Sequence, residues 1–313
     1  MYFILQNFAM LEPNMSVAVV SHDAGGAEVV SSYIARAGAK CNCCLAGPAV
    51  SIFERKLGPI DVVPLHLAIS MSSWLLCGSS WQSDLEWQAI KLARENGKRS
   101  VAFLDHWGNY RERFIRGKEI SLPDQIWVGD VQAETLARQV FPEMEIILVG
   151  NPYIEDLRRE IAAFPKQPDV GSKAELNVLV LCEPMREHGL KGFGNERHWG
   201  YTEEEALHYL FSNLHVFGRG IGRIVIRPHP SEPRHKYDWL RTHYRLPIIV
   251  GGGKTLLDDI MESDVVVGFQ SMAMVVGLQA GRRVISCIPP GGKACSLPHS
   301  EIESLQEILL KLQ

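Results

Sequence analysis

Residues 16–38, SVAVVSHDAGGAEVVSSYIARAG, combine a strand, a glycine loop and a helix in one short segment. The run SVAVVSH is apolar and rich in valine, which is typical of a strand buried on both faces. The segment after Gly25 and Gly26 has apolar residues at helical spacing and ends at Gly38, a residue type that commonly closes helices. A strand that passes through a short loop into a helix is the repeating unit of parallel α/β sheets.

The same alternation continues through the first half of the chain. Short runs rich in β-branched and aromatic residues alternate with longer amphipathic segments, which predicts a parallel sheet covered by helices. We expect strands at residues 16–22, 40–47, 61–65, 72–80, 99–105, 124–130 and 145–150, and helices at residues 25–38, 83–97 and 131–141.

Residues 151–174 interrupt this rhythm, because they are rich in proline and charge, and they predict a hinge helix followed by a linker. The alternation then restarts. We expect strands at residues 175–182, 223–228, 246–251, 264–269 and 282–288, and helices at residues 202–218, 233–244, 254–263, 271–281 and 301–312. The expected organisation is therefore two facing α/β domains of similar size, at residues 1–150 and 175–313, joined by residues 151–174.

Composition narrows the class of protein. The 313 residues are 46% hydrophobic and 22% charged, with a formal net charge of −4, so there is no general reason to expect a nucleic-acid partner. The seven cysteines lack the spacing of zinc ligands, and we interpret them as reduced thiols of a cytoplasmic protein without a metal site. Residues 1–14 have no basic residue and are too short to span a bilayer, so we expect no signal peptide and no transmembrane segment. Peripheral membrane association stays open.

Candidate site residues follow the first predicted strand. His22 and Asp23 stand at its end, before Gly25 and Gly26, where small residues let the backbone approach a ligand and helix amides favour an anion. The dinucleotide fingerprint is absent, since the two glycines are adjacent and the third is missing. We expect these four residues to contact a ligand, with a functional role for Asp23. The alternative is that Asp23 only caps the helix.

A second group lies in FLDHWGNYRERF, residues 103–114, directly after a predicted strand. Asp105, His106, Trp107 and Arg111 concentrate carboxylate, ring and guanidinium groups in one loop, which suits a sugar-like ligand. The alternative interpretation is a packed loop in which Asp105 pairs with an arginine of the same segment.

The second half supplies a third group, at the end of the strand in RIVIRPHPSE, residues 223–232. Proline fixes its own backbone and restricts the residue before it, so Pro228 and Pro230 hold Arg227 and His229 in extended conformations. The carboxyl edge of an open α/β sheet is where ligands bind. We expect Arg227, His229 and Pro230 to contact a ligand.

Three further positions are expected at the same edge. Glu183 follows the strand at residues 175–182, and Gln270 and Ser271 stand at a predicted helix start, where amides and a hydroxyl suit a phosphate. Structural salt bridging by Glu183 and capping by Ser271 remain alternatives. GGGKTLLDD, residues 251–259, lacks the first glycine of a phosphate loop, and Thr255 with Asp258 predicts a capping box instead. Gly252 of that turn can still contact a nucleotide.

In architecture the chain resembles the GT-B superfamily of glycosyltransferases and their relatives, such as UDP-N-acetylglucosamine 2-epimerase. The resemblance rests on two α/β halves joined by VGNPYIEDL, residues 149–157, and on residues 262–286, which are similar to the C-terminal nucleotide-sugar region of that superfamily. It implies two facing Rossmann-like domains with parallel sheets, of which the N-terminal one binds the acceptor and the C-terminal one the nucleotide-sugar donor.

Within that superfamily, RPHP at residues 227–230 resembles the His-Pro motif of bacterial sialyltransferases, polysialyltransferases and related capsule enzymes. FQSMA at 269–273 is similar to their serine motif, and HDAGG at 22–26 to their acidic-glycine motif. The resemblance implies that His229 binds the donor phosphate and that Asp23 is the general base. The serine motif usually has two serines and this chain has one, so CMP-, UDP- and CDP-linked donors all stay open.

The sequence therefore predicts a metal-independent glycosyltransferase of surface glycan synthesis, with no cofactor and with a nucleotide-sugar donor and a glycan or small-molecule acceptor as partners. Asp23, or else Asp105, takes the proton of an acceptor hydroxyl. His229 and the helix start at Ser271 stabilise charge on the leaving phosphate. One alternative is a nucleotide-sugar epimerase or hydrolase, and another is a nucleotide-sugar-binding protein without catalysis.

Overall fold

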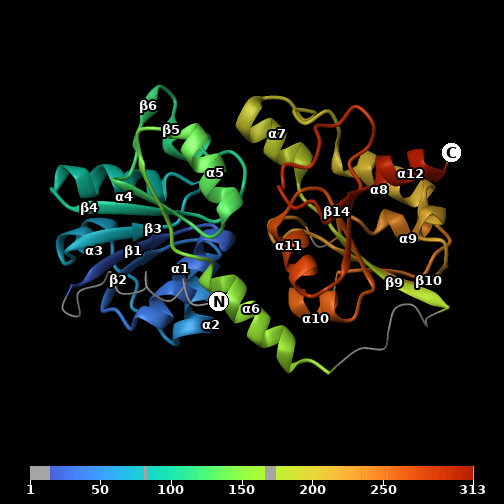
Figure 1. Ribbon diagram of the computed structural model, residues 1–313, viewed down its shortest axis with the longest axis horizontal. Coiled ribbons are helices and arrows are strands. Elements are labelled where there is room, and N and C mark those ends of the chain that lie inside the picture. Colours follow the sequence, from blue (N-terminus) through green and yellow to red (C-terminus); the bar gives the residue numbers. More distant parts are fainter. Residues whose placement is uncertain (1–14, 81–82, 166–173, 234, 252, 313) are drawn as a thin grey trace. The chain divides into compact units, whose positions relative to one another are not determined.

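The computed structural model describes residues 15–80, 83–165, 174–233, 235–251 and 253–312. The chain folds into two compact units, an N-terminal one, Met1–Asp156, and a C-terminal one, Leu157–Gln313. Each unit contains a six-stranded parallel sheet with helices packed against it (Figure 1). The prediction of an α/β protein with two parallel sheets is confirmed.

The N-terminal sheet has the strand order β2-β1-β3-β4-β7-β8. Its strands are β1 (Val17–Ser21), β2 (Cys41–Leu45), β3 (Trp74–Cys77), β4 (Arg99–Leu104), β7 (Gln125–Val128) and β8 (Glu145–Leu148), and a small hairpin is formed by β5 (Ile115–Arg116) and β6 (Glu119–Ile120). The helices are α1 (Ala24–Ala37), α2 (Ala49–Leu57), α3 (Leu65–Ser70), α4 (Leu85–Glu95), α5 (Val131–Val140) and α6 (Pro152–Ala163), whose first residues belong to this unit. A 3-10 turn, η2 (Glu112–Phe114), precedes the hairpin.

The C-terminal sheet has the strand order β11-β10-β9-β12-β13-β14. Its strands are β9 (Glu175–Leu181), β10 (Gly220–Arg227), β11 (Ile248–Val250), β12 (Val265–Gly268), β13 (Arg283–Ser286) and β14 (Ile302–Ser304). The helices are α7 (Met185–Phe193), α8 (Glu203–Ser212), α9 (Trp239–His243), α10 (Leu256–Met261), α11 (Met272–Gln279) and α12 (Leu305–Leu312), with a 3-10 turn η4 (Leu214–Phe217).

Local sequence signals explain several boundaries. Gly38 ends α1 in the left-handed region at φ 59°, and Thr255 with Asp258 forms the predicted capping box of α10. The strand expected at residues 61–65 is wrong, because only Val62 makes a bridge, to Cys43, before α3 begins. Pro64 has no N–H to donate to a strand ladder, and it stands instead at the N-cap of α3.

The helix expected at residues 233–244 is shorter than predicted, since α9 is helical and residues 235–238 before it form turns. These turns bring Lys236 and Tyr237 inward, against Glu232. Central strands of both sheets are buried as the sequence predicts, with every residue of β1 and β12 buried.

Among the described residues, no helix is long and apolar enough to cross a membrane. The seven cysteines are free thiols, and five of them are buried.

Candidate functional site

Three neighbouring strands of the C-terminal sheet end at one level. Arg227 of β10 pairs with Leu181 of β9, and the pairing of Val267 with Val180 brings Gly268 of β12 beside Leu181. The carboxyl ends of these parallel strands therefore share one edge, with about 5 Å between neighbouring strands. Two positions beyond this row stand Glu183, His229 and Gln270.

Strand order reverses between β9 and β12, because β10 and β11 lie on one side of β9 and the later strands on the other. Such a reversal is where open α/β sheets bind ligands. Glu183 follows β9 and Gln270 follows β12, so these two predicted donor-binding residues stand on either side of the reversal. The sheet thus brings them together.

The side chain of Glu183 contacts the backbone at the start of α11. Its Oε1 accepts a hydrogen bond from the Gln270 amide at 2.8 Å. Burial raises the pKa of Glu183 to about 7, against the opposing effect of the amides of Phe269, Gln270 and Ser271, which stabilise the charged form. A carboxyl group therefore lies where a helix N-terminus favours an anion.

Ser271 occupies the N-cap position of α11 with extended backbone angles, φ −79° and ψ 156°, but its side chain makes no capping hydrogen bond. The alternative interpretation, in which this hydroxyl serves the helix, is therefore not supported. The hydroxyl stands next to the amides that Glu183 contacts.

The ring of His229 has a defined tautomer. Its Nδ1 accepts a hydrogen bond from the Ser231 amide at 3.2 Å and lies 2.7 Å from the Ser231 hydroxyl. The backbone N–H of Ser231 can only donate, so Nδ1 must accept, and in the neutral ring the proton is on Nε2. The His229 amide donates to Glu232 at 2.7 Å, which fixes the backbone of the PHP turn.

A buried charge cluster supports this turn, and sequence reasoning missed it. Lys236 Nζ lies 2.8 Å from Glu187 and 2.9 Å from Glu232, and it also contacts Glu203. Tyr237 donates to Glu232 at 2.6 Å. The three carboxylates are close enough together to hold a metal ion, but the cation among them is the Lys236 ammonium. Burial lowers the pKa of Lys236, and its hydrogen bonds to the carboxylates outweigh that effect and raise the pKa overall.

The other predicted donor-binding residues are placed differently. Arg227 forms an ion pair with the buried Asp259 at 2.5 Å and donates to the Lys254 carbonyl at 3.2 Å, so its guanidinium ties β10 to the region of α10. Pro230 is exposed beside His229. Gly252 lies outside the described residues. Donor contacts by these residues stay predictions.

In the N-terminal unit, His22 and Asp23 form a pair at the end of β1. His22 Nδ1 lies 2.7 Å from Asp23 Oδ1, and both side chains are 32% exposed. A carboxylate only accepts, so Nδ1 carries the proton of this hydrogen bond. Asp23 occupies the N-cap position of α1 but makes no side-chain capping bond, so the capping interpretation is not supported.

Glu86 lies beneath this pair, and no sequence motif pointed to it. It belongs to the first turn of α4, is 2% exposed, and accepts a hydrogen bond from the His22 amide at 2.7 Å. Burial raises its pKa to about 7, with a smaller contribution from the charge of Asp23. Its second oxygen, Oε2, is buried without a hydrogen-bond partner among the residues described. A titratable carboxyl group thus contacts the backbone of the pair.

Gly25 and Gly26 are required by packing. A Cβ at Gly25 would stand 2.1 Å from Asp105 Oδ2, and one at Gly26 would stand 3.2 Å from the α-carbon of Gly78. The start of α1 therefore lies directly against the ends of β3 and β4. The lack of space for a side chain at both positions explains the two adjacent glycines, so no dinucleotide-binding role is needed to account for them.

Asp105 is engaged in a buried ion pair. Its Oδ1 lies 2.8 Å from Arg113 Nη1, and the side chains are 12% and 7% exposed. Arg113 also donates to the Ser79 hydroxyl at 3.0 Å and to the Ser79 carbonyl. This is the arginine pairing of the alternative interpretation, so the geometry favours Asp23 over Asp105 as a base.

The remaining loop residues divide by exposure. Trp107 is buried and its indole donates to the Asp130 carboxylate at 3.0 Å, while Asp130 also caps α5 through the Ala133 amide. His106 is partly buried beside Trp107, with ring centroids 5.9 Å apart, and Arg111 is exposed. Acceptor contacts by these residues stay predictions.

Neither a protein-family model nor a curated protein sequence matches the chain. Solved structures do resemble it. The Methanocaldococcus jannaschii UDP-GlcNAc 2-epimerase in complex with UDP-GlcNAc and UDP is 11% identical, with a TM-score of 0.64 over 95% of this chain and 91% of that one. S. aureus MnaA with UDP is 10% identical, with a TM-score of 0.60 over 87% and 79%. The Neisseria meningitidis UDP-GlcNAc 2-epimerase bound to UDP-GlcNAc is 14% identical, with a TM-score of 0.52 over 83% and 79%.

These likenesses establish the fold, which is the GT-B fold. The GT-B architecture expected from the sequence is thereby confirmed. At such low identity, neither activity nor site residues follow from the comparison.

Proposed function

We propose that this protein is a glycosyltransferase that binds a nucleotide-sugar donor at the carboxyl edge of its C-terminal sheet. The observation that carries the proposal is the arrangement of Glu183, His229 and Gln270, which stand at equivalent positions beyond three neighbouring strands. Amides, a hydroxyl and an imidazole N–H at one sheet edge are groups that bind phosphate.

Each group has a distinct role in this proposal. His229 Nε2–H donates to a donor phosphate, because Nδ1 already accepts from the Ser231 amide. The Ser271 hydroxyl and the first amides of α11 bind the same phosphate group once Glu183 is neutral or displaced. These donors stabilise the negative charge that builds on the leaving nucleotide. The proposal requires no cofactor and no metal ion.

Asp23 is the proposed general base, held by His22 at the end of β1. In this assignment residues 1–150 bind the acceptor, residues 175–313 bind the donor and residues 151–174 connect them. Arg111 and His106 remain candidates for acceptor contacts. A role in surface glycan synthesis in the cytoplasm belongs to the same proposal.

A second candidate function is a nucleotide-sugar epimerase or hydrolase. It is favoured by the likeness to solved structures, since two of the structures compared above are UDP-GlcNAc 2-epimerases. The two functions differ in one respect that can be measured. An epimerase or hydrolase converts its donor with no acceptor present, whereas a transferase depends on one.

The test has two steps. Thermal shift with CMP, UDP, CDP, GDP and their sugars identifies the nucleotide, because a ligand that binds only the folded state stabilises it. The best donor is then incubated with and without a panel of hydroxyl acceptors, and products are followed by mass spectrometry and by NMR of the sugar C1 and C2 protons. Acceptor-dependent glycoside supports the transferase. Exchange at C2, or donor loss without an acceptor, identifies the second candidate, and binding without any product identifies a non-catalytic binding protein.

The His229→Ala variant is expected to bind the selected nucleotide about tenfold or more weakly, because one phosphate hydrogen bond is lost. Its thermal stability should be nearly unchanged, since the ring lies in a partly exposed turn. Isothermal titration calorimetry measures the affinity. His235→Ala is the matched control, because His235 is 90% exposed in the same segment and pairs only locally with Asp238. Equal affinities of both variants and the unaltered protein would remove His229 from the site.

Affinity for a nucleotide sugar is expected to fall as the pH rises through about 7, the pKa of Glu183. Above this pKa the Glu183 carboxylate is charged, so it accepts hydrogen bonds from the backbone N–H groups at the start of α11 and repels phosphate. The negative charge of Glu232 also raises the pKa of Glu183. Below this pKa the neutral Glu183 carboxyl neither holds these N–H groups as strongly nor repels phosphate. A nucleotide sugar is the right probe, because its diphosphate diester does not titrate near neutral pH. Glu183→Gln should bind more tightly at mildly alkaline pH and lose this dependence, and an unchanged pH profile in the variant would contradict the assignment.

A further inference from the structure

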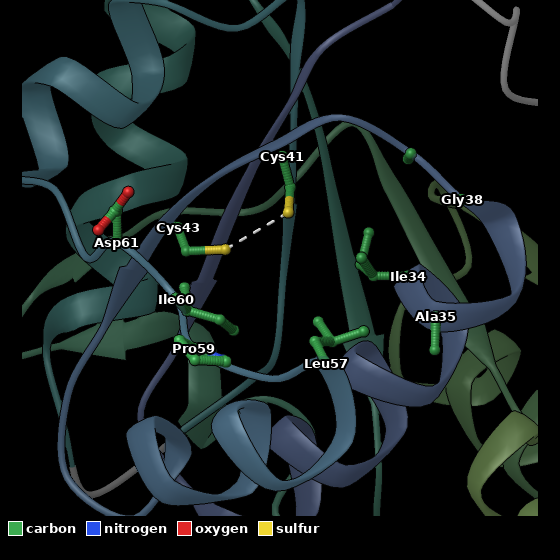
Figure 2. Close-up of a pocket in the computed structure, with 10 residues that line it drawn as sticks. Ile34, Ala35, Gly38, Cys41, Cys43, Leu57, Pro59, Ile60 and Asp61 are labelled. Atoms are coloured by element: carbon green, nitrogen blue, oxygen red, sulfur yellow. Dashed lines mark hydrogen bonds between the residues drawn. The ribbon is translucent and has the colours of Figure 1, made fainter.

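A cavity of about 410 Å³ lies in the N-terminal unit, beside the edge strand β2. Its lining includes the apolar residues Ile34 of α1, Leu57 of α2, and Pro59 with Ile60 of the following loop, together with the exposed, acidic Asp61 (Figure 2). It adjoins the amino end of β2, whereas His22 and Asp23 stand at the carboxyl end of β1. The cavity is therefore separate from the candidate site, and its volume is in the range of small-molecule pockets.

Two cysteines line this cavity with their sulfurs directed at each other (Figure 2). Cys41 and Cys43 are two positions apart in β2, so their side chains share one face of the strand. Cys43 Sγ donates to Cys41 Sγ at 3.5 Å. This hydrogen bond stabilises a thiolate on Cys41 and keeps the proton on Cys43.

Cys41 differs from the other thiols in both exposure and acidity. The hydrogen bond from Cys43 lowers the pKa of Cys41 to about 7, against the opposing effect of burial. The same interaction raises the pKa of Cys43. Cys295 is the other cysteine that is not fully buried, and burial raises its pKa. Cys41 is thus the accessible thiol with most thiolate at neutral pH, which is the reactive form.

We propose that Cys41 is a covalent modification site and that its cavity takes small apolar α,β-unsaturated carbonyl compounds, such as short-chain alkenals. The Cys41 thiolate forms a bond to the β-carbon, and the π electron pair of the alkene moves to the carbonyl as an enolate. Water protonates the α-carbon, so the net reaction adds the thiol across the double bond and needs no oxidant. Cys43 remains a thiol throughout. The apolar wall of Ile34, Leu57 and Ile60 binds the alkyl chain.

The test is adduct formation by the full-length protein with acrolein, which has no alkyl chain, and with trans-2-hexenal, followed by intact-mass and peptide mass spectrometry. Cys41 is expected to be labelled first, with a mass gain equal to the whole aldehyde. Its rate should saturate with hexenal concentration, because hexenal binds before it reacts, and should not saturate with acrolein. The rate should rise with pH to a midpoint near 7.

Three variants test the parts of the site. Cys43→Ala is expected to slow labelling at neutral pH about tenfold and to move the midpoint upward by roughly one pH unit, towards that of an ordinary thiol. Cys44→Ala is the matched control, since Cys44 lies on the same strand with its side chain on the opposite face, and it should leave the rate unchanged. Ala35→Phe places a ring at an exposed helix position that lines the cavity, and it should abolish saturation with hexenal without disturbing the core.

The proposal is overturned if another cysteine reacts first, or if the rate for hexenal stays linear and the pH midpoint is that of a free thiol. It is also overturned if dilute peroxide alone joins Cys41 to Cys43 faster than hexenal adds, because the pair would then be a redox switch. None of these readouts depends on nucleotide-sugar turnover. The proposal therefore stands or fails independently of the proposed function.

Discussion

The Asp23→Asn variant is expected to turn over its acceptor about a hundredfold more slowly, or worse, with donor affinity little changed. The substitution nearly preserves size and keeps an oxygen that can accept from His22, but it removes the basic carboxylate. Loss of a positioned base costs about 10² to 10⁴ in rate. Because Asp23 makes no capping bond to α1, the fold should not depend on its charge. Steady-state kinetics with the identified donor and acceptor measure the effect as kcat against KM.

Asp105→Asn is the matched control, since Asp105 stands at the end of β4 in the same sheet. It is expected to reduce stability instead of acting on the chemical step, because it weakens the buried pair with Arg113. The base is misassigned if Asp105→Asn abolishes turnover in a protein that remains folded while Asp23→Asn is fully active. If both variants turn over normally, neither Asp23 nor Asp105 acts as the base, and the proposed transferase mechanism is wrong.

The sequence predicted the elements that depend on local signals. Buried strands appear as valine-rich runs, and the parallel strands of one sheet end at a common edge. From their positions alone, Asp23 could therefore be placed at the carboxyl edge of the N-terminal sheet, and Glu183 and His229 at that of the C-terminal sheet. The capping box of Thr255 and the helix end at Gly38 follow from residue types at fixed spacing. These predictions needed no knowledge of which elements are neighbours.

Residues that act through long-range contacts could not be predicted. Glu86 lies in an ordinary first turn of a helix. It contacts the backbone N–H of His22, which is 64 positions earlier in the sequence, only because α4 packs on β1. Asp105 pairs with Arg113 of its own segment, as the alternative interpretation expected, but residue type and spacing do not tell which arginine of that segment is the partner. Capping by Ser271 was a reasonable expectation from residue type, but its hydroxyl makes no such bond. Each case depends on tertiary geometry, which residue type and spacing do not encode.

The Lys236→Met variant is expected to lose about 3–5 kcal/mol of unfolding free energy, the cost of removing one partner from a buried ion pair. Met keeps much of the length of the side chain, so packing changes little, but Glu203 and Glu232, at 0% and 1% exposure, lose their cation. Urea unfolding followed by circular dichroism measures the change. Lys91→Met is the matched control, because Lys91 and Glu119 are 44% and 56% exposed, and such surface pairs contribute little to stability.

The pH dependence of this loss separates lost charge pairing from lost packing. Burial already raises the pKa of Glu203 in the intact cluster, and removal of Lys236 takes away the interaction that opposes this shift. A carboxyl whose folded pKa is raised binds a proton more readily than the unfolded chain, so the variant should be most destabilised at mildly alkaline pH and should recover as the pH falls. A loss that is the same at all pH values would mean that Lys236 contributes packing alone. Because Glu232 also accepts from the His229 amide, a real loss of charge pairing should weaken nucleotide binding in the folded variant, and Lys91→Met should not.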